Sequence, residues 1–200
     1  MNAKPILIDL PEALETSRLL LQMPKAGYGP GLHEAIMDGY DDYVKWLGWD
    51  PKTPSSQVVE EECRKHHAEF ILREFIRYII IEKETKRIIG RCAFPSFQAI
   101  WPIPLFGISY FIRRNARHHG YATEAAHALA LLAFQNLKAK KVEIYCDAEN
   151  GASQKIPQKL GFALECVKKG GWPRLDGQLG VLQTYALFSE EPLPKWEVKW

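Results

Sequence analysis

The sequence predicts an α+β fold, in which one mixed β-sheet carries helices on its faces. Three observations support this class. Apolar residues recur at helical spacing from residue 56 to about residue 75, and β-rich runs follow them directly. A polar pentapeptide at 82–86 separates two of these runs and is typical of a hairpin turn. Later, the apolar run 105–112 leads through a single glycine, Gly120, into an alanine-rich segment at 122–137 that is typical of a long helix.

The first part of the chain alternates compact apolar runs with breaks rich in glycine and proline. Residues 18–23 (RLLLQM) predict a strand that Pro24 ends. The GYGPG run at 27–31 predicts a loop, and 32–39 a helix entered just after it. After a second break at 50–56, Ser56 is the expected N-cap of a further helix. The apolar face of that helix is expected to consist of Val59, Cys63, Phe70, Ile71 and Phe75.

The second part of the chain supplies most of the predicted sheet, which has six or seven strands in all. Asn150 is expected to open a short helix that ends near Lys159. The whole chain, 1–200, is expected to form one domain with a core at about 14–188, and the pattern does not place the Pro- and Trp-rich tail at 189–200. The strands expected after residue 74 are 75–81, 87–94, 105–112, 142–146, a run that follows 160–162, and 181–188.

Composition argues against several classes of function. The chain is 46% hydrophobic and 25% charged, as soluble globular proteins are, and its net charge of +2 with no basic stripe gives no sign of nucleic-acid binding. No signal peptide and no apolar run near 18 residues is found, so we expect a cytoplasmic protein without a membrane partner. The four cysteines form no CxxC pair, and the adjacent His66 and His67 diverge by about 100° on a helix, so no metal site is expected.

The stretch RNARHHGYATEA at 114–125 joins the strand 105–112 to the long helix. A helix start exposes unpaired N–H groups and about half a positive charge, which together favour a bound phosphate. Gly120 lacks a Cβ and lets the backbone approach a ligand, Arg117 adds a cation, and the Thr123 hydroxyl can join the first-turn donors. The alternative is that Gly120 only permits a tight turn. No GxxxxGK[ST] or GxGxxG motif is present, which disfavours kinase, P-loop and dinucleotide-binding classes.

Residues 117–122 (RHHGYA) resemble the R/Q-x-x-G-x-G/A signature of the GNAT superfamily of N-acetyltransferases. The segment 14–21 (LETSRLLL) is similar to the opening strand of the RimJ/RimL branch, whose named members acetylate ribosomal-protein N-termini. The resemblance extends over about residues 14–188. The other matching segments, in the expected order, are ISYFI at 108–112, NGAS at 150–153, KLGF at 159–162 with Glu165, Leu175-Asp176, and Tyr185-Ala186-Leu187.

The resemblance implies a GNAT fold, with a mixed, mostly antiparallel sheet of six to seven strands that splays between its fourth and fifth strands, helices on both faces, and acetyl-CoA wedged in the gap. It implies that Phe111, Ile112 and Arg113 offer backbone groups to the pantetheine arm, which Asn150 also contacts. His118 and His119 either stand near the phosphates or adenosine or are solvated turn residues. The pyrophosphate would be held by Thr123 and by the main-chain amides of Arg117, His118, His119, Gly120, Tyr121 and Ala122.

Ser153 is the residue that the resemblance assigns to catalysis. With Asn150 as N-cap, Ser153 takes the third helical position, where its hydroxyl can face out of the helix start. In the family, a Ser or Tyr here protects or protonates the CoA thiolate as the acetyl group leaves, and the helix dipole also stabilises a thiolate. The alternative is a role in local capping.

The chain departs from the family pattern at three places. Segment 167–173 (VKKGGWP) has no carboxylate where a candidate base is expected, and Glu165 and Asp176 only flank it, so the base is unassigned. Ser109 stands where glycine is common. Pro157 removes one N–H from the helix after Asn150, which should therefore be short or kinked.

The implied reaction is direct transfer from acetyl-CoA to a primary amine in a ternary complex, with a protein N-terminus, that of a ribosomal protein included, as the expected acceptor. A small amine such as a polyamine, amino sugar or amino acid is the first alternative, and a non-catalytic acyl-CoA-binding module is the second. The oligomeric state, a homodimer included, stays open. In this family the region that walls the acceptor cleft would contain Asp38, Asp41, Asp42 and Asp50 with Tyr40, Tyr43, Trp46 and Trp49, either to attract a cationic acceptor or as a solvated helix over an aromatic core.

Overall fold

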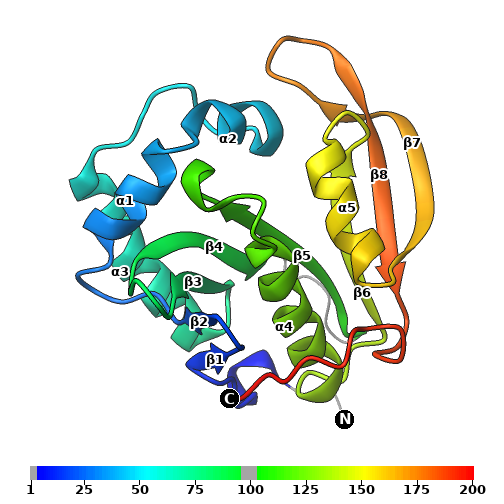
Figure 1. Ribbon diagram of the computed structural model, residues 1–200, viewed down its shortest axis with the longest axis horizontal. Helices are drawn as coiled ribbons and strands as arrows, with labels where there is room; N and C mark the ends of the chain where they lie inside the picture. Colours follow the sequence, from blue (N-terminus) through cyan, green and yellow to red (C-terminus); the bar gives the residue numbers. More distant parts are fainter. Residues whose placement is uncertain (1–3, 96–102) are drawn as a thin grey trace.

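The computed structural model describes residues 4–95 and 103–200 of the chain. Over these residues the chain forms one mixed sheet of eight strands in the order β1-β2-β3-β4-β5-β6-β8-β7 (Figure 1). Neighbouring strands are antiparallel except β5 and β6, which are parallel. The strands are β1 (Ala13–Glu15), β2 (Leu19–Gln22), β3 (Ile76–Glu82), β4 (Ile88–Phe94), β5 (Leu105–Ile112), β6 (Lys141–Asp147), β7 (Ala163–Pro173) and β8 (Leu179–Leu187).

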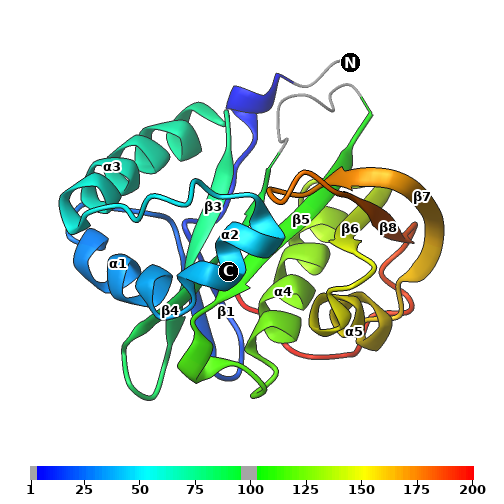
Figure 2. The ribbon, with the colours of Figure 1, turned by 90° about the horizontal axis from the view of Figure 1, so that it is seen from above.

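Helices cover both faces of the sheet (Figure 2): α1, α2 and α3 lie over one face, and α4 lies over the other with α5 beside it. The alanines of α4 let it approach the sheet closely, and most of its residues are buried. Within the described ranges, no helix combines the length and apolar character needed to cross a bilayer. The helices are α1 (Gly29–Met37), α2 (Tyr40–Leu47), α3 (Ser56–Leu72), α4 (Tyr121–Gln135) and α5 (Gly151–Lys159), with short 3-10 turns η1 (Pro5–Leu7) and η2 (Arg114–Ala116).

The sheet opens between β5 and β6. Their parallel pairing runs only from Leu105↔Lys141 to Ile108↔Ile144. Beyond Ile108, β5 stays paired with β4 as far as Ile112, while β6 stays paired with β8 as far as Asp147. The two strands therefore separate at their carboxyl ends, and this is the splay that was expected between the fourth and fifth predicted strands.

Two hydrophobic clusters fix the layers. The larger lies between the sheet and α4, and includes Phe106 and Leu129. The smaller lies between the sheet and α1 to α3, and includes Val59, Ile79 and Phe111. Because β5 contributes Phe106 to one cluster and Phe111 to the other, its position is set from both sides.

The predicted fold class is confirmed, and the differences concern element ends and one extra strand. The eighth strand, β1, has only three residues, which is too short to leave a periodic pattern. Helix α1 begins at Gly29, inside the predicted loop 27–31, because Pro30 fits the first turn of a helix. Strand β5 coincides with the predicted run 105–112.

Helix α3 differs from the expectation in its cap and in its buried face. Ser55, not Ser56, is the N-cap, and its hydroxyl accepts from the amide of Val58 at 3.3 Å. Ile71 is exposed, and Phe75 lies after the helix has ended at Leu72. The buried residues of this helix are Val59, Cys63, His66 and Phe70.

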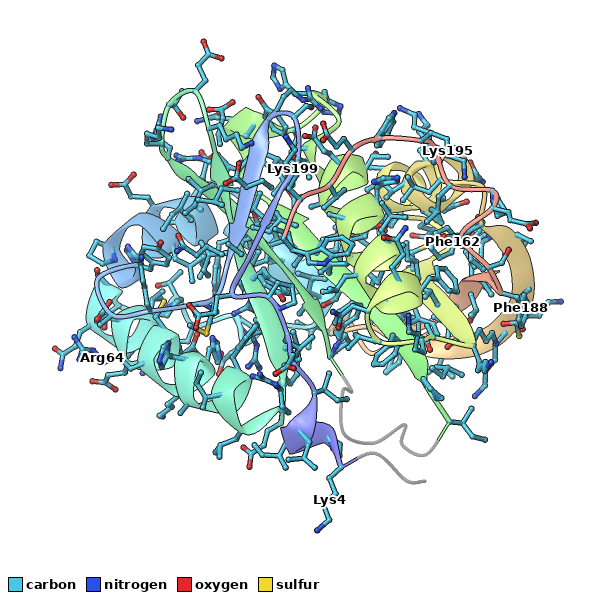
Figure 3. The ribbon with its side chains drawn as sticks, turned by 90° about the horizontal axis from the view of Figure 1, so that it is seen from below. Lys4, Arg64, Phe162, Phe188, Lys195 and Lys199 are labelled. Atoms are coloured by element: carbon cyan, nitrogen blue, oxygen red, sulfur yellow. The ribbon has the colours of Figure 1, made fainter. Side chains whose placement is uncertain are left out.

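The C-terminal tail, which the sequence pattern did not place, packs against the sheet edge. Figure 3 shows it passing from Phe188 by way of Lys195 to Lys199 beside β1. Lys199 forms an antiparallel bridge with Glu15, and the Leu193 side chain joins the larger hydrophobic cluster. The tail therefore packs against the larger hydrophobic cluster and pairs with the outer edge of β1 at Glu15.

Candidate active site

The turn between β5 and α4 is built around two left-handed residues. His118 has φ 67° and Gly120 has φ 83°, and Gly120 is the N-cap of α4. A glycine cap has no side chain to accept hydrogen bonds from the first helical turn, so the N–H groups of Tyr121 and Ala122 point outward without a cap. The conformation therefore presents main-chain donors at the positive end of the helix dipole.

A cavity of about 460 Å³ extends from this turn into the gap between β5 and β6. Every residue that the resemblance assigned to coenzyme binding or catalysis lines it except Arg113 and His119, and Asp42, Tyr43 and Trp46 line it from the expected acceptor region. The walls come from the end of β5, the glycine turn, the first turn of α4, and one side each of α5 and α2. The structure thus brings the glycine turn together with Asn150 and Ser153, which lie about thirty residues further along the chain.

Arg113 and His119 lie beside this cavity. The Arg113 amide donates to the Ile89 carbonyl at 2.8 Å, and the Arg113 carbonyl accepts from the Ala116 amide at 3.1 Å. Both backbone groups thus have a partner within the chain, and the expected contact of Arg113 with pantetheine stays a prediction. Since successive residues of a strand point their backbone groups to opposite edges, the N–H of Ile112 faces the gap. The His119 Nδ1 lies 2.8 Å from the Arg117 carbonyl, at the exposed rim of the turn.

Ser153 faces the end of β5 across the gap. The Asn150 side chain caps α5 by accepting from the Ser153 amide at 3.1 Å, as the sequence predicted. The Ser153 Oγ lies 3.2 Å from the Tyr110 hydroxyl. Burial raises the pKa of Tyr110, so this hydroxyl is protonated in the physiological range. Pro157 lies inside α5, which ends two residues later, in agreement with the short helix that was expected.

Comparison with known proteins identifies the architecture. The family model of the acetyltransferase (GNAT) domain matches residues 18–163. The chain belongs to the GNAT family. It is an acetyl-CoA-dependent N-acetyltransferase, and an uncharacterized N-acetyltransferase of Bacillus subtilis, YjdG, is 27% identical to it over 164 residues, which cover 76% of this chain and 89% of that protein.

Solved structures show the same fold. The ribosomal-protein-S5-alanine acetyltransferase of Vibrio fischeri matches with a TM-score of 0.77 and 14% identity, over 93% of this chain and 100% of that one. RimL, a ribosomal L7/L12 alpha-N-protein acetyltransferase in complex with coenzyme A, matches with a TM-score of 0.75 and 16% identity, over 88% of this chain and 96% of that one.

In this GNAT acetyltransferase, Arg117 ties α2 to the glycine turn. Its Nε donates to the Ile112 carbonyl at 3.0 Å, its terminal nitrogen pairs with Asp42, and its guanidinium lies over the Tyr43 ring. The hydrogen bond from Arg117 holds the pKa of Asp42 below its ordinary value. Asp38 is similarly engaged, by the side chain of Arg113. These two carboxylates are therefore partners of the turn and are not free to attract a cationic acceptor.

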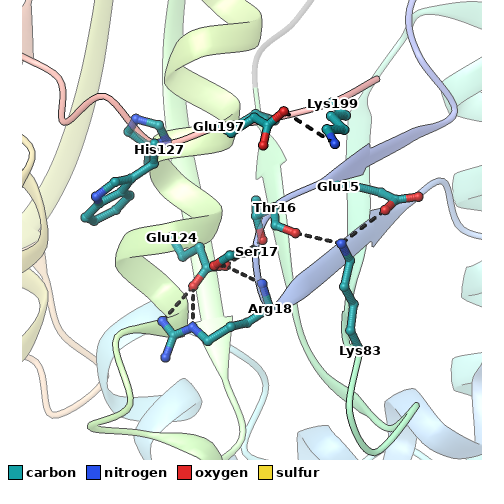
Figure 4. A pocket seen from close by; sticks show the side chains of 11 residues that line it. Glu15, Thr16, Ser17, Arg18, Lys83, Glu124, His127, Glu197 and Lys199 are labelled. Atoms are coloured by element: carbon teal, nitrogen blue, oxygen red, sulfur yellow. Dashed lines mark hydrogen bonds and ion pairs between the residues drawn. The ribbon is translucent and has the colours of Figure 1, made fainter.

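Sequence reasoning missed the support beneath the turn, which Figure 4 shows. Glu124, on the first turn of α4, pairs with the guanidinium of Arg18 (Figure 4). Arg18 also donates to the His119 carbonyl at 2.8 Å. Arg18 belongs to the segment LETSRLLL and Glu124 to the stretch RNARHHGYATEA, but the pairing joins parts of the chain more than a hundred residues apart. Local patterns carry no signal for such a contact.

The two carboxylates that flank segment 167–173, Glu165 and Asp176, are engaged in other contacts. Glu165 pairs with Lys141 at 2.6 Å, and Asp176 accepts from the Gln178 amide within the β7–β8 turn. Among the described residues that line the cavity, Asp42 is the one carboxylate, and Arg117 occupies it. Within the part of the chain that the structure describes, no side chain of this cavity therefore offers an unpaired carboxylate as a general base.

Proposed function

We propose that this acetyltransferase transfers the acetyl group of acetyl-CoA to the α-amino group of a protein N-terminus, by direct attack in a ternary complex. The observation that carries the proposal is the cavity itself: it joins an uncapped helix start, suited to a diphosphate, to Ser153, and the described residues that line it include no unpaired carboxylate. The uncapped helix start suits coenzyme A. The lack of an unpaired carboxylate among the described lining residues restricts the acceptor to amines that are partly neutral without a base.

The coenzyme would lie along the gap in a defined direction. The amides from Gly120 to Ala122, with the Thr123 hydroxyl, would hold the diphosphate. The N–H of Ile112, which faces the gap, and the side-chain amide of Asn150 would hold the pantetheine arm. This places the thioester near Ser153, whose hydroxyl and helix dipole would stabilise the departing thiolate. Positioning of the two substrates then supplies most of the rate.

The acceptor must reach the thioester as a neutral amine without help from a carboxylate. At about pH 7.4, an α-amino group with a pKa of about 7.8 is roughly a quarter neutral, whereas a lysine with a pKa of about 10.4 is neutral in roughly one molecule per thousand. The cavity therefore favours an N-terminal acceptor. The names of two structural neighbours, which describe ribosomal-protein acetyltransferases, fit the same acceptor class.

The test is release of CoA thiol with three groups of acceptors: peptides with a free N-terminus, the same peptides with a blocked N-terminus and one free lysine, and small amines. We expect turnover with the first group and little with the second. Turnover confined to polyamines, amino sugars or amino acids would assign the small-amine class instead. Tight acetyl-CoA binding without any turnover would overturn catalysis.

Loss of coenzyme affinity in Gly120→Ala would support the binding mode. An added Cβ meets only the Arg18 side chain at 3.5 Å, so the fold should lose about 1–2 kcal/mol through the left-handed backbone alone. The methyl group would also hold a phosphate away from the amides, and we expect the Kd for CoA to rise at least tenfold. Unchanged affinity would contradict a diphosphate at this turn.

A further inference from the structure

The hydroxyl groups of Ser153 and Tyr110 meet across the gap between β5 and α5. Tyr110 Oη lies 3.2 Å from Ser153 Oγ and 3.5 Å from the Ser153 carbonyl oxygen. Both residues line the cavity, so a ligand in the gap lies beside the pair. The phenol comes from a strand and the alcohol from a helix start, which fixes their separation by the fold.

The direction of this hydrogen bond follows from the chemistry of the two groups. A phenol is a far stronger acid than an alcohol, and both atoms of Ser153 near Tyr110 are oxygens that can accept. Burial keeps the phenol protonated, because it raises the pKa of Tyr110. Ser153 Oγ is the nearer of the two acceptors, at 3.2 Å against 3.5 Å for the carbonyl oxygen, so the phenol would donate to Ser153 Oγ. The serine hydrogen is then left over for a third partner.

We propose that Tyr110 is a positioning residue that turns the hydroxyl of Ser153 into a fixed hydrogen-bond donor toward the sulfur of coenzyme A. This inference rests on the proposed function. Without Tyr110, the serine hydroxyl would be free to rotate and to donate to a backbone carbonyl, as helix-start serines often do. With it, the hydrogen is directed at the leaving group before the reaction begins.

The pair stabilises the thiolate but does not supply its proton. A thiol has a pKa of about 8.5, below that of a phenol or an alcohol, so complete transfer of a proton from either group to the thiolate is unfavourable. During attack the N–C bond forms, the C–S bond breaks, and the electron pair of that bond moves to sulfur. The nitrogen becomes positively charged and gives up its proton, which neutralises the thiolate. Ser153 and Tyr110 stabilise the sulfur charge until that proton arrives.

The pKa of the CoA thiol, followed by thiolate absorbance in the binary complex, tests the role of Tyr110. In Tyr110→Phe we expect this pKa to rise by about half a unit to one unit, and kcat to fall about three- to tenfold with little change in the KM for acetyl-CoA. Tyr145→Phe is the control, because its hydroxyl contacts Glu143 outside the cavity, and it should match the wild type. A merely structural loss would not move the thiol pKa.

A double variant distinguishes an effect of Tyr110 through Ser153 from a direct effect of Tyr110 on the thiol. Tyr110→Phe in a Ser153→Ala background should change neither quantity further, because the phenol would act only through the serine. Additive effects, or a thiol pKa equal to the wild-type value in Tyr110→Phe, would overturn the inference while leaving the proposed function intact. If Ser153→Ala itself alters neither kcat nor the thiol pKa, the proposed role of Ser153 is wrong. An absence of CoA binding would remove the proposed function as well.

Discussion

The carboxylate of Glu124 joins the turn between β1 and β2 to the first turn of α4, directly beneath the glycine turn. It accepts from the Thr16 hydroxyl at 2.6 Å, from the Arg18 amide at 3.0 Å and from the Arg18 Nε at 2.8 Å. Burial by itself would raise the pKa of Glu124, but hydrogen bonds from Thr16 and Arg18 outweigh it, and the pKa lies below its ordinary value. Arg18 also donates to the His119 carbonyl, so Glu124 stabilises the fold directly and the shape of the glycine turn through Arg18.

Glu124→Gln should lower both the stability of the fold and the affinity of the glycine turn for CoA. The amide keeps the shape but loses the charge, so we expect the free energy of unfolding to fall by about 1–3 kcal/mol at neutral pH, and CoA affinity to fall several-fold. The folded pKa of Glu124 is lowered, so its contribution is present above the unfolded pKa and is lost as the pH falls through the folded value. The deficit of the variant should therefore shrink in acid.

Denaturant titration at several pH values, with CoA binding measured alongside, checks this prediction. Glu197→Gln is the matched control, because Glu197 lies in the same surface cavity as Glu124 but its side chain is exposed. A Glu124 variant that behaves like the Glu197 variant would show that the buried carboxylate does not support the turn.

At the scale of elements, β5 has to approach β4 very closely to open the gap on its other edge. Gly90 on β4 stands opposite Ile112, and a Cβ at this position would collide with the Phe111 carbonyl oxygen. A backbone atom cannot move aside as a side chain can, so only glycine fits here. The carboxyl end of β5 is thereby held on β4 and away from β6.

Gly90→Ala is therefore expected to push β5 toward the gap. We expect a loss of about 2–3 kcal/mol of unfolding free energy and a fall in CoA affinity that exceeds the loss expected from instability alone. Gly107→Ala in β5 is the control, since its Cβ would meet only a Tyr145 ring carbon at 3.2 Å, and the ring can shift. Equal losses in the two variants, measured by denaturant titration and calorimetric binding, would contradict this account.

The elements also differ in how closely the sequence predicts them. Strand β5 and the capped start of α5 were predicted closely, because apolar periodicity and an Asn cap are local signals. The glycine turn was located by its motif. The contacts that shape the site were not predicted: Arg117 with Asp42 and Tyr110 with Ser153 join residues 75 and 43 positions apart. Such contacts depend on how layers stack, which no short window of sequence records.

At the scale of the whole molecule, the layer between α3 and the sheet holds a titratable group in the uncharged state. His66 is buried, and within the described residues its Nδ1 has no hydrogen-bond partner. Burial, with the nearby charges of Arg77 and Arg91, lowers the pKa of His66 to about 3. The unfolded chain, in contrast, takes up this proton near pH 6.5. Acid therefore favours the unfolded chain.

The sign and size of the effect follow from linkage. Above the pKa of the unfolded histidine, His66 does not change the free energy of unfolding. Below that pKa each further drop in pH lowers the free energy of unfolding, and the loss reaches about 2 kcal/mol near pH 5. We expect His66→Leu, which cannot titrate, to show a flatter dependence of the unfolding free energy between about pH 7 and pH 5. Denaturant titrations across this range measure both slopes, with circular dichroism confirming that each protein is folded at the start. Parallel curves for the two proteins would mean that His66 is charged in the native state, and that the layer between α3 and the sheet is open to water.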